Sequence, residues 1–388
     1  ILAARKARGT KLVVIDPRRT ASCDGADMHL ALKAGTDAAL FNGLLCAIHE
    51  AGALDKEFLA TVQGFNEALI AASSDRDTVT GLSEAQLAAF YKLWIGTGKV
   101  VTVYSQGVNQ STSGSDKVNA ILNCHLATGR IGTPGCGPFS ITGQPNAMGG
   151  REVGGLANML ACHLDIENAD HRAAVHEFWD SPRMADAPGL KAVDLFRAAG
   201  DGRIKALWII HTNPAVTMPD ADAVTKAIAD CDFVVVSDIT TATDTARLAH
   251  VLLPASAWAE KEGTVTNSDR TISRQRAALP APGVARPDWE ILAEVGRRMG
   301  WREAFDYACP AEIFREYAAL SGLAGTLGRD FDISAKAELS DSAYMAMAPF
   351  RWPASATRNG GRFFADGRFY HPDGKARMLP IRYRPPAS

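Results

Sequence analysis

The sequence lacks the signals of several common classes of protein. No apolar run approaches the roughly 18 residues of a membrane-spanning helix, and no basic-then-apolar signal segment precedes residue 10. The 41 Lys and Arg residues nearly balance the 43 Asp and Glu residues, so a net charge of -2 gives no footprint for nucleic acid or an anionic membrane. Hydrophobic residues make up 47% of the 388 residues, which excludes a disordered chain and predicts about two to three domains.

Paired cysteines and the common nucleotide-binding motifs are also missing. The seven cysteines never form a Cys-x-x-Cys pair, so we expect no disulfide framework, zinc ribbon, complete iron–sulfur site or other metal ligand, and most cysteines should be buried hydrophobes. Neither Gly-x-Gly-x-x-Gly after an early strand nor Gly-x-x-x-x-Gly-Lys-Ser/Thr occurs, which speaks against a standard NAD-binding fold and a P-loop. Without Gly-x-Ser-x-Gly, a hydrolase loses most of its support.

Short apolar segments alternate with amphipathic ones along much of the chain. Residues 11–16 are apolar and rich in β-branched side chains, which is typical of a strand buried in a parallel sheet. Further strands are expected at 100–104, 206–210, 233–236 and 250–253, and helices at 37–51, 83–95, 115–128, 219–230 and 288–299. The alternation predicts an α/β fold with two doubly wound, mostly parallel-sheet lobes, residues 1–145 and 146–258. Residues 259–388, rich in turns, are expected to form a small irregular α+β lobe.

The two predicted lobes share a weak internal similarity. Val13–Asp16 and Val234–Asp238 each end in Asp, and a short apolar segment follows each of them. Chance explains a match of this strength as well as duplication does, so both explanations stay open. Duplicated halves would be expected to bind two similar ligands.

Polar side chains follow four of the predicted strands, at 16–19, 105–110, 211–214 and 237–238. In open parallel sheets, ligands bind beyond the carboxyl ends of the strands. Carboxylates, carboxamides and arginines together suit a nucleotide with a purine edge and a pyrophosphate. The alternative is that these residues only cap turns, as Asp16, Asp238 and Asn213 each do readily. For one residue that alternative is the better one, but four such strand ends favour a ligand.

Glycines concentrate between residues 129 and 155, where they allow the backbone to approach a ligand closely. The side chains left to face such a ligand are Gln144, Asn146, Met148, Arg151 and Glu152. Arg151 beside Glu152 could hold a small oxyanion or form an ion pair with its neighbour. The residue types favour the oxyanion.

Several motifs in collinear order resemble one known family. They include Val-Ile-Asp-Pro-Arg-Arg-Thr (14–20), Gln-Gly-Val-Asn-Gln (106–110), Ala-Thr-Gly-Arg-Ile-Gly (127–132) and Glu-Lys-Glu-Gly-Thr (260–264). On these motifs the sequence resembles the bis-molybdopterin guanine dinucleotide oxidoreductases of the DMSO reductase type. Within that family, residues 137–155 are similar to the assimilatory and periplasmic nitrate reductases. Formate dehydrogenases tend to have Arg-Gly-Gln-Asn-Asn there.

The resemblance implies that two guanine dinucleotide arms hold one molybdenum ion, which agrees with two similar α/β halves. Carried over by motif, the contacts to one arm would be Asp16, Arg18, Gly35, Thr36 and Asp37, with Gln106 and Gln110 near the pterin. The contacts to the other arm would be Asn213, Ser237, Asp238, Lys261 and Asp288. Lys261 would neutralise a pterin or phosphate; without the resemblance, its neighbourhood indicates only a solvated charge run.

The resemblance also implies a reaction. Gln144 and Arg151 match positions that line the substrate funnel, where Arg151 would attract and orient nitrate. Molybdenum would take an oxygen atom from nitrate and release nitrite. Two electrons would come from ferredoxin, flavodoxin or an NADH-linked reductase subunit. The Gln-Pro-Asn-Ala-Met-Gly-Gly-Arg version of the loop (144–151) indicates nitrate assimilation in the cytoplasm.

Two parts of the family pattern have no counterpart in this sequence. Family members begin with a cysteine-rich segment for one four-iron (4Fe-4S) cluster, followed by a cysteine ligand to molybdenum, and they end with a barrel domain. Since the sequence opens at Ile1 and lacks these parts, we expect a central fragment that is inactive alone. The alternatives are a formate dehydrogenase alpha subunit of the same family, a non-catalytic molybdopterin-like subunit, and an unrelated nucleotide-binding module.

Overall fold

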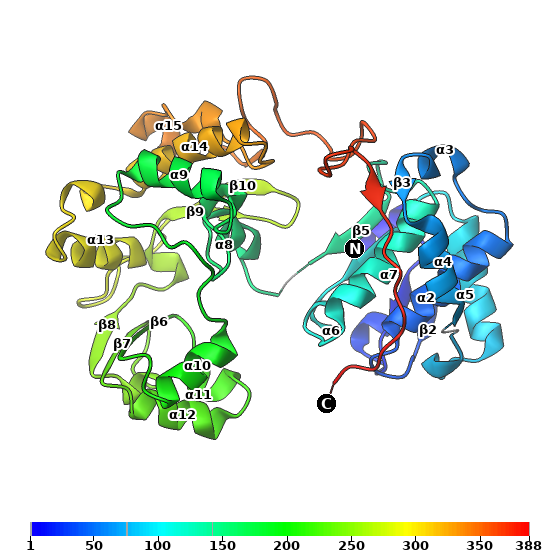
Figure 1. The fold of residues 1–388 in the computed structure, drawn as a ribbon, viewed down its shortest axis with the longest axis horizontal. Helices are drawn as coiled ribbons and strands as arrows, with labels where there is room; N and C mark the ends of the chain where they lie inside the picture. The colour runs from blue at the N-terminus through cyan, green and yellow to red at the C-terminus, as the bar shows by residue number, and fades with distance from the viewer. Residues whose placement is uncertain (1, 75–76, 142, 388) are drawn as a thin grey trace. The chain divides into compact units, whose positions relative to one another are not determined.

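The computed structural model describes residues 2–74, 77–141 and 143–387. Its internal contacts divide the chain into two compact units, drawn in Figure 1. The first unit comprises residues 1–143 and 362–388, and the second comprises residues 144–361. The assignment of residues 1–145, 146–258 and 259–388 to two cofactor-binding lobes and a third small lobe remains a prediction.

The first unit combines short parallel strands with helices. Its strand pairs are β1 (Val13–Ile15) with β2 (Met28–Leu30) and β4 (Val101–Tyr104) with β5 (Gly137–Ser140), both parallel. The longer helices are α2 (Asp37–Glu50), α4 (Phe65–Ser74), α5 (Glu84–Gly96) and α7 (Gly114–Ala127). The shorter elements are α1 (Leu2–Arg8), α3 (Lys56–Leu59), α6 (Gln106–Asn109), β3 (Val62–Gln63) and β12 (Ala376–Arg377).

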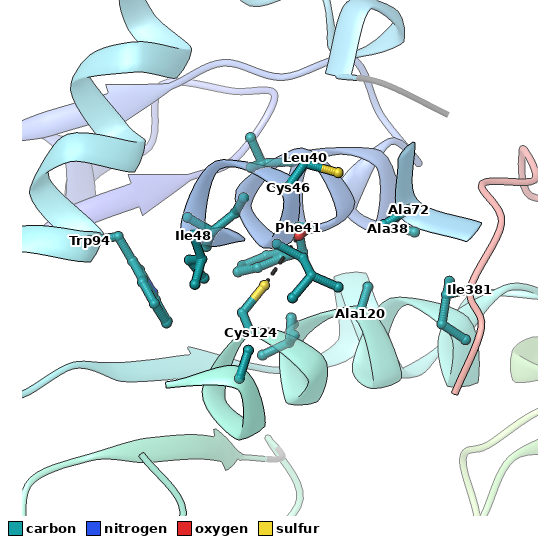
Figure 2. Close-up of a cluster of buried hydrophobic side chains, with 14 of the residues drawn as sticks. Ala38, Leu40, Phe41, Cys46, Ile48, Ala72, Trp94, Ala120, Cys124 and Ile381 are labelled. Atoms are coloured by element: carbon teal, nitrogen blue, oxygen red, sulfur yellow. Dashed lines mark hydrogen bonds between the residues drawn. The ribbon is translucent and has the colours of Figure 1, made fainter. Parts of the chain in front are cut away.

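The core of the first unit lies between α2 and α7. Helix α2 is apolar on nearly all sides, as expected for a helix enclosed by α4, α5 and α7. Figure 2 shows Phe41 and Ile48 of α2 near Ala120 and Cys124 of α7. The Cys124 thiol is fully buried, donates to the Phe41 carbonyl oxygen at 3.1 Å, and has a pKa raised by burial. Five of the seven cysteines are buried, which confirms that most act as small hydrophobes.

A C-terminal segment completes this core. Strand β12 pairs in parallel with β3, and the chain then crosses α2 and α7. The side-chain amides of Asn42 and Asn123 donate to the carbonyl oxygens of Ile381 and Leu379, each at 2.9 Å. Both asparagines are buried, so these bonds satisfy backbone carbonyls that have no neighbouring strand. The segment is therefore a structural part of the first unit.

The second unit contains a parallel sheet in the order β6 (Ala206–Ile210), β7 (Phe233–Asp238), β8 (Val251–Pro254). Helices α10 (Ala192–Gly200) and α12 (Ala221–Ala229) contribute apolar side chains to the core beneath it, and the short α11 (Pro214–Thr217) follows β6. The register pairs Ile210 with Ser237 and Asp238 with Pro254. The carboxyl ends of the three strands therefore meet at one edge.

The rest of the second unit is built on an antiparallel sheet in the order β11 (Phe350–Arg351), β10 (Thr271–Gln275), β9 (Gly263–Thr266). Its helices are α8 (Ala147–Glu152), α9 (Ala169–Trp179), α13 (Asp288–Arg298), α14 (Pro310–Thr326) and α15 (Asp341–Met345). Helices α8 and α14 both contact β9. The predicted α/β class is thus confirmed, and this antiparallel sheet lies within the residues expected to be α+β, although its individual strands were not predicted.

No helix in the described ranges is long and apolar enough to cross a membrane.

His125 of α7 is a buried, neutral histidine. Its Nε2 lies 2.8 Å from the Thr102 hydroxyl, and its ring packs edge-on against Trp94. The Arg130 guanidinium lies over the Trp94 ring, 4.1 Å from its centroid. Burial, followed by the charge of Arg130, lowers the pKa of His125 to about 3.

This depressed pKa predicts a loss of stability in acid. The unfolded chain binds a proton at His125 near pH 6.5 and the folded chain only near pH 3. Its contribution to stability is therefore fully present above pH 6.5 and decreases by about 1.4 kcal/mol per pH unit as the pH falls through this window. Urea unfolding of the parent and of His125→Phe at several pH values between 6.5 and 4.5 tests this. A pH dependence that is the same in both proteins would refute the assignment.

Candidate functional site

The side-chain amide of Asn213 lies at the edge where β6 and β7 end, and two hydrogen bonds fix its orientation. The Oδ1 atom of Asn213 accepts hydrogen bonds from the backbone N–H of Thr245 at 3.2 Å and from its hydroxyl at 2.7 Å. Because a backbone N–H can only donate, this contact defines which side-chain atom is the oxygen. The Nδ2 group of Asn213 donates to no other group in the described part of the chain. It therefore remains available for an acceptor at this edge.

Ser237 and Asp238 lie at the end of the adjacent strand. The buried Ser237 hydroxyl accepts a hydrogen bond from the Trp208 indole N–H at 2.9 Å. The Asp238 Oδ1 atom accepts a hydrogen bond from the backbone N–H of Ile239 at 2.7 Å, and its Oδ2 atom lies 3.4 Å from the Thr243 hydroxyl. Asp238 therefore stabilises its own turn. An ionised carboxylate has about four acceptor positions, so it can also receive a ligand donor.

The structure brings Lys261 and Asp288 together at the same edge. Lys261 Nζ lies 2.6 Å from Asp288 Oδ2, and the other carboxylate oxygen lies 2.6 Å from His211 Nε2. His211 follows β6, and its backbone N–H donates to the Ser237 carbonyl oxygen at 3.0 Å. The predicted residues of the second arm thus form one neighbourhood, joined by His211. Sequence reasoning noted His211 only as a strand-end residue.

In the first unit, three predicted residues form the turn into α2. Gly35 has a φ of +85°, and a Cβ there would lie 2.7 Å from Pro386 Cδ. Thr36 is buried and donates to the Lys33 carbonyl oxygen at 2.6 Å. Asp37 is the first residue of α2 and pairs with Lys117 Nζ at 2.8 Å. A substitution at Gly35 would therefore disturb this turn by both strain and contact.

Lys117 is a functional candidate that the sequence did not reveal. Only 3% of its side chain is exposed, and Nζ also donates to the Gly107 carbonyl oxygen at 3.2 Å. It thereby links Asp37 to α6, whose first residue is Gln106. Nothing in the sequence distinguishes Lys117 from a surface lysine of α7, because its partners are distant in the chain.

The remaining residues predicted for the first arm lie at strand ends. Asp16 follows β1 and accepts the backbone N–H of Arg18 at 2.8 Å, and the Arg18 side chain is 84% exposed. Gln106 accepts a hydrogen bond from the Ser105 hydroxyl. Gln110 caps the C-terminal end of α6 and is exposed. Lys117 links Asp37 to α6, but among the described residues no hydrogen bond or ion pair joins Asp16 or Arg18 to it. The structure therefore does not connect these two residues to the others predicted for the first arm through Lys117.

The predicted substrate residues lie on and before α8. Gln144 and Arg151 are exposed, whereas only 1% of Glu152 is exposed. The Glu152 carboxylate accepts hydrogen bonds from the Thr266 hydroxyl at 2.7 Å and from the Trp352 indole N–H at 2.6 Å. Burial raises the pKa of Glu152, although these hydrogen bonds oppose the shift. The Glu152 carboxylate is engaged by Thr266 and Trp352, and within the described ranges no ion pair joins it to Arg151, so the guanidinium is available for another anion.

A second contact fixes the start of α8. Asn146 has a left-handed φ of 62°, and its Oδ1 accepts the backbone N–H of Thr266 at 2.8 Å. A Cβ on Gly149 would lie 2.1 Å from that same oxygen, so only glycine fits there. Asn146 and Glu152 therefore anchor both ends of α8 to the last residue of β9. Arg151 is thus carried on a fixed helix.

The donors and acceptors in the second unit fit an anionic nucleotide. Asn213 Nδ2 and the remaining N–H groups of Lys261 are donors, and Asp238 is an acceptor suited to the edge of a purine. In the described residues, no group of three or more His, Cys, Asp or Glu side chains could hold a metal ion.

Comparison with known proteins identifies the fold and the family of this chain. Acetylene hydratase from Pelobacter acetylenicus shares the fold, with a TM-score of 0.70 over 98% of this chain and 54% of that chain, at 18% sequence identity. The family model for molybdopterin oxidoreductases matches residues 1–298. The chain therefore belongs to the molybdopterin oxidoreductase family, as its motifs predicted.

Several curated relatives match nearly the whole chain. A nitrate reductase from Klebsiella oxytoca is 51% identical over 97% of this chain and 43% of its own length. The assimilatory nitrate reductase catalytic subunit of Bacillus subtilis is 33% identical over 98% of this chain and 53% of its own. The F420-dependent formate dehydrogenase subunit alpha of Methanocaldococcus jannaschii is 31% identical over 98% and 54%, respectively. The chain spans about half the length of the relatives it matches.

The anchoring of α8 can be tested through Glu152. In Glu152→Ala, the Thr266 hydroxyl and the Trp352 indole lose their acceptor, and each buried unsatisfied donor costs about 1–3 kcal/mol. We expect a matching decrease in the free energy of unfolding, measured in urea by tryptophan fluorescence. The exposed Glu177 of α9 provides the control, and Glu177→Ala should change stability by less than about 0.5 kcal/mol. Equal stability of the two variants would contradict the anchoring role.

Proposed function

We propose that this chain is the cofactor-binding part of a nitrate reductase catalytic subunit, which reduces nitrate to nitrite in nitrate assimilation. The observation that carries the proposal is the Arg151 side chain, which is exposed on an anchored helix beside a glutamate that it does not neutralise. The identity of 51% to a nitrate reductase over 97% of the chain supports the same substrate.

The cofactor in this proposal is molybdenum bound by two molybdopterin guanine dinucleotides. When bound, it supplies the two-electron chemistry that converts nitrate, with two protons, to nitrite and water. Asp238 would accept from a guanine edge, Asn213 Nδ2 would donate to the base or sugar, and Lys261 would neutralise the phosphate or pterin. Ser237 and Asp288 belong to the same site.

The first arm would be held by the strand-end and turn residues of the first unit. Arg18 supplies an exposed guanidinium for phosphate, and the turn at Gly35 and Thr36 leads into the N-terminal end of α2, which favours a negative charge. Asp16 and Asp37 would complete this set, with Gln106 and Gln110 near the pterin. Lys117 would keep Asp37 and α6 aligned.

Arg151 would bind and orient nitrate through two parallel N–H···O bonds, because its planar fork matches a planar oxyanion. Gln144 would donate a further hydrogen bond from the preceding loop. A 4Fe-4S cluster would be held by cysteines of a longer protein, since no group of three or more His, Cys, Asp or Glu side chains in the described residues could hold a metal. Electrons would reach it from ferredoxin, flavodoxin or an NADH-linked subunit, in the cytoplasm.

Arg151→Gln tests the substrate assignment in the cofactor-loaded enzyme. Hydrogen bonds to charged groups contribute about 1.5–3 kcal/mol each, so loss of the pair should lower kcat/KM for nitrate by more than about 100-fold. The assay is nitrate-dependent oxidation of a reduced viologen, with molybdenum content measured in parallel. Arg183→Gln, at an exposed arginine of the same unit, should retain the parental kcat/KM. An unchanged kcat/KM in Arg151→Gln would overturn the role of Arg151.

A further inference from the structure

His211 has a backbone conformation that histidine rarely adopts. Its φ is +53°, in the left-handed region, directly after the last residue of β6. Such a conformation is strained in a residue other than glycine and persists only where the surroundings enforce it. Asn, Asp and His tolerate it better than most residues. The surroundings of His211 should therefore explain why glycine does not occupy this position.

The side chain supplies that explanation. His211 Nε2 lies 2.6 Å from Asp288 Oδ1, and the opposite oxygen of the same carboxylate lies 2.6 Å from Lys261 Nζ. Glycine would remove the strain but also this contact. The three side chains are 21% to 30% exposed, so solvent only partly screens the pair of contacts.

The three residues come from three separate elements. His211 follows β6, Lys261 precedes β9, and Asp288 is the first residue of α13. A carboxylate is stabilised there by the N-terminal end of a helix. With both oxygens engaged, Asp288 mainly fixes its two neighbours, and Lys261 retains two N–H groups for a ligand.

We propose that His211 and Asp288 are positioning residues that hold Lys261 at the edge where Asn213 and Asp238 lie. This inference rests on the proposed function, because it assigns the edge to one dinucleotide arm. His211 is bonded to the parallel sheet itself, because its backbone N–H donates to the Ser237 carbonyl oxygen of β7. Asn213 and Asp238 would then contact one end of the arm while Lys261 contacts its phosphate or pterin portion.

The rate at which the holoenzyme loses its pterin in dilute urea, followed by pterin fluorescence, tests this role. We expect His211→Gly to accelerate release about tenfold, because one hydrogen bond to a charged group is lost. Asp288→Asn should have a similar effect. The double variant should release pterin little faster than either single variant, since both changes break the same chain of contacts.

Asp220→Gly is the matched control. Asp220 is exposed, also has a left-handed φ, of 55°, and lies before α12 without contacting Asp288. It reproduces the relief of backbone strain, and its release rate should equal that of the parent. Release from His211→Gly at the parental rate, or additive effects in the double variant, would overturn the positioning role. Parental protein that contains no molybdopterin would instead refute the proposed function.

Discussion

The parallel register of β6, β7 and β8 is the constraint on which the candidate site depends. It pairs Ile210 with Ser237, so the residues that follow β6 and those that end β7 occupy one edge. Below that edge, alternate side chains such as Ile209 and Val236 are buried in an apolar core. A shift of the register by one residue would turn those side chains outward, so core burial and the alignment of the polar edge are determined together.

Internal hydrogen bonds also fix the orientation of the groups that are left available for a ligand. Asn213 uses its oxygen for Thr245, which leaves the amide N–H groups for a ligand. Glu152 and Asn146 use their oxygens for Thr266 and Trp352, which fixes the helix that carries Arg151. In each case the buried acceptor atoms are paired within the protein. The Asn213 N–H groups and the Arg151 guanidinium are left available. Pre-organised donors of this kind suit the binding of an anion.

Local patterns predicted the parts of the fold that local physics determines. Apolar runs located β6 and β7, and helical periodicity located α2, α7 and α13. Residues whose role depends on distant partners were beyond such patterns. His211 and Lys117 acquire their roles from Asp288 and Asp37, far along the chain. The β9–β10 hairpin and α14, whose interior contains Gly322 and Gly325, lack the strong signals of the parallel strands. The asparagines that hold residues 379–381 likewise have no sequence signature.

The most direct test of the central claim is the substrate preference of the cofactor-loaded enzyme. One assay follows the oxidation of reduced viologen by nitrate, and a second follows the reduction of oxidised viologen by formate. Molybdenum and nitrite are quantified in parallel. The account predicts stoichiometric molybdenum and one nitrite formed for every two electrons consumed, with no turnover of formate. Molybdenum-loaded protein that turns over formate and leaves nitrate unchanged would contradict it.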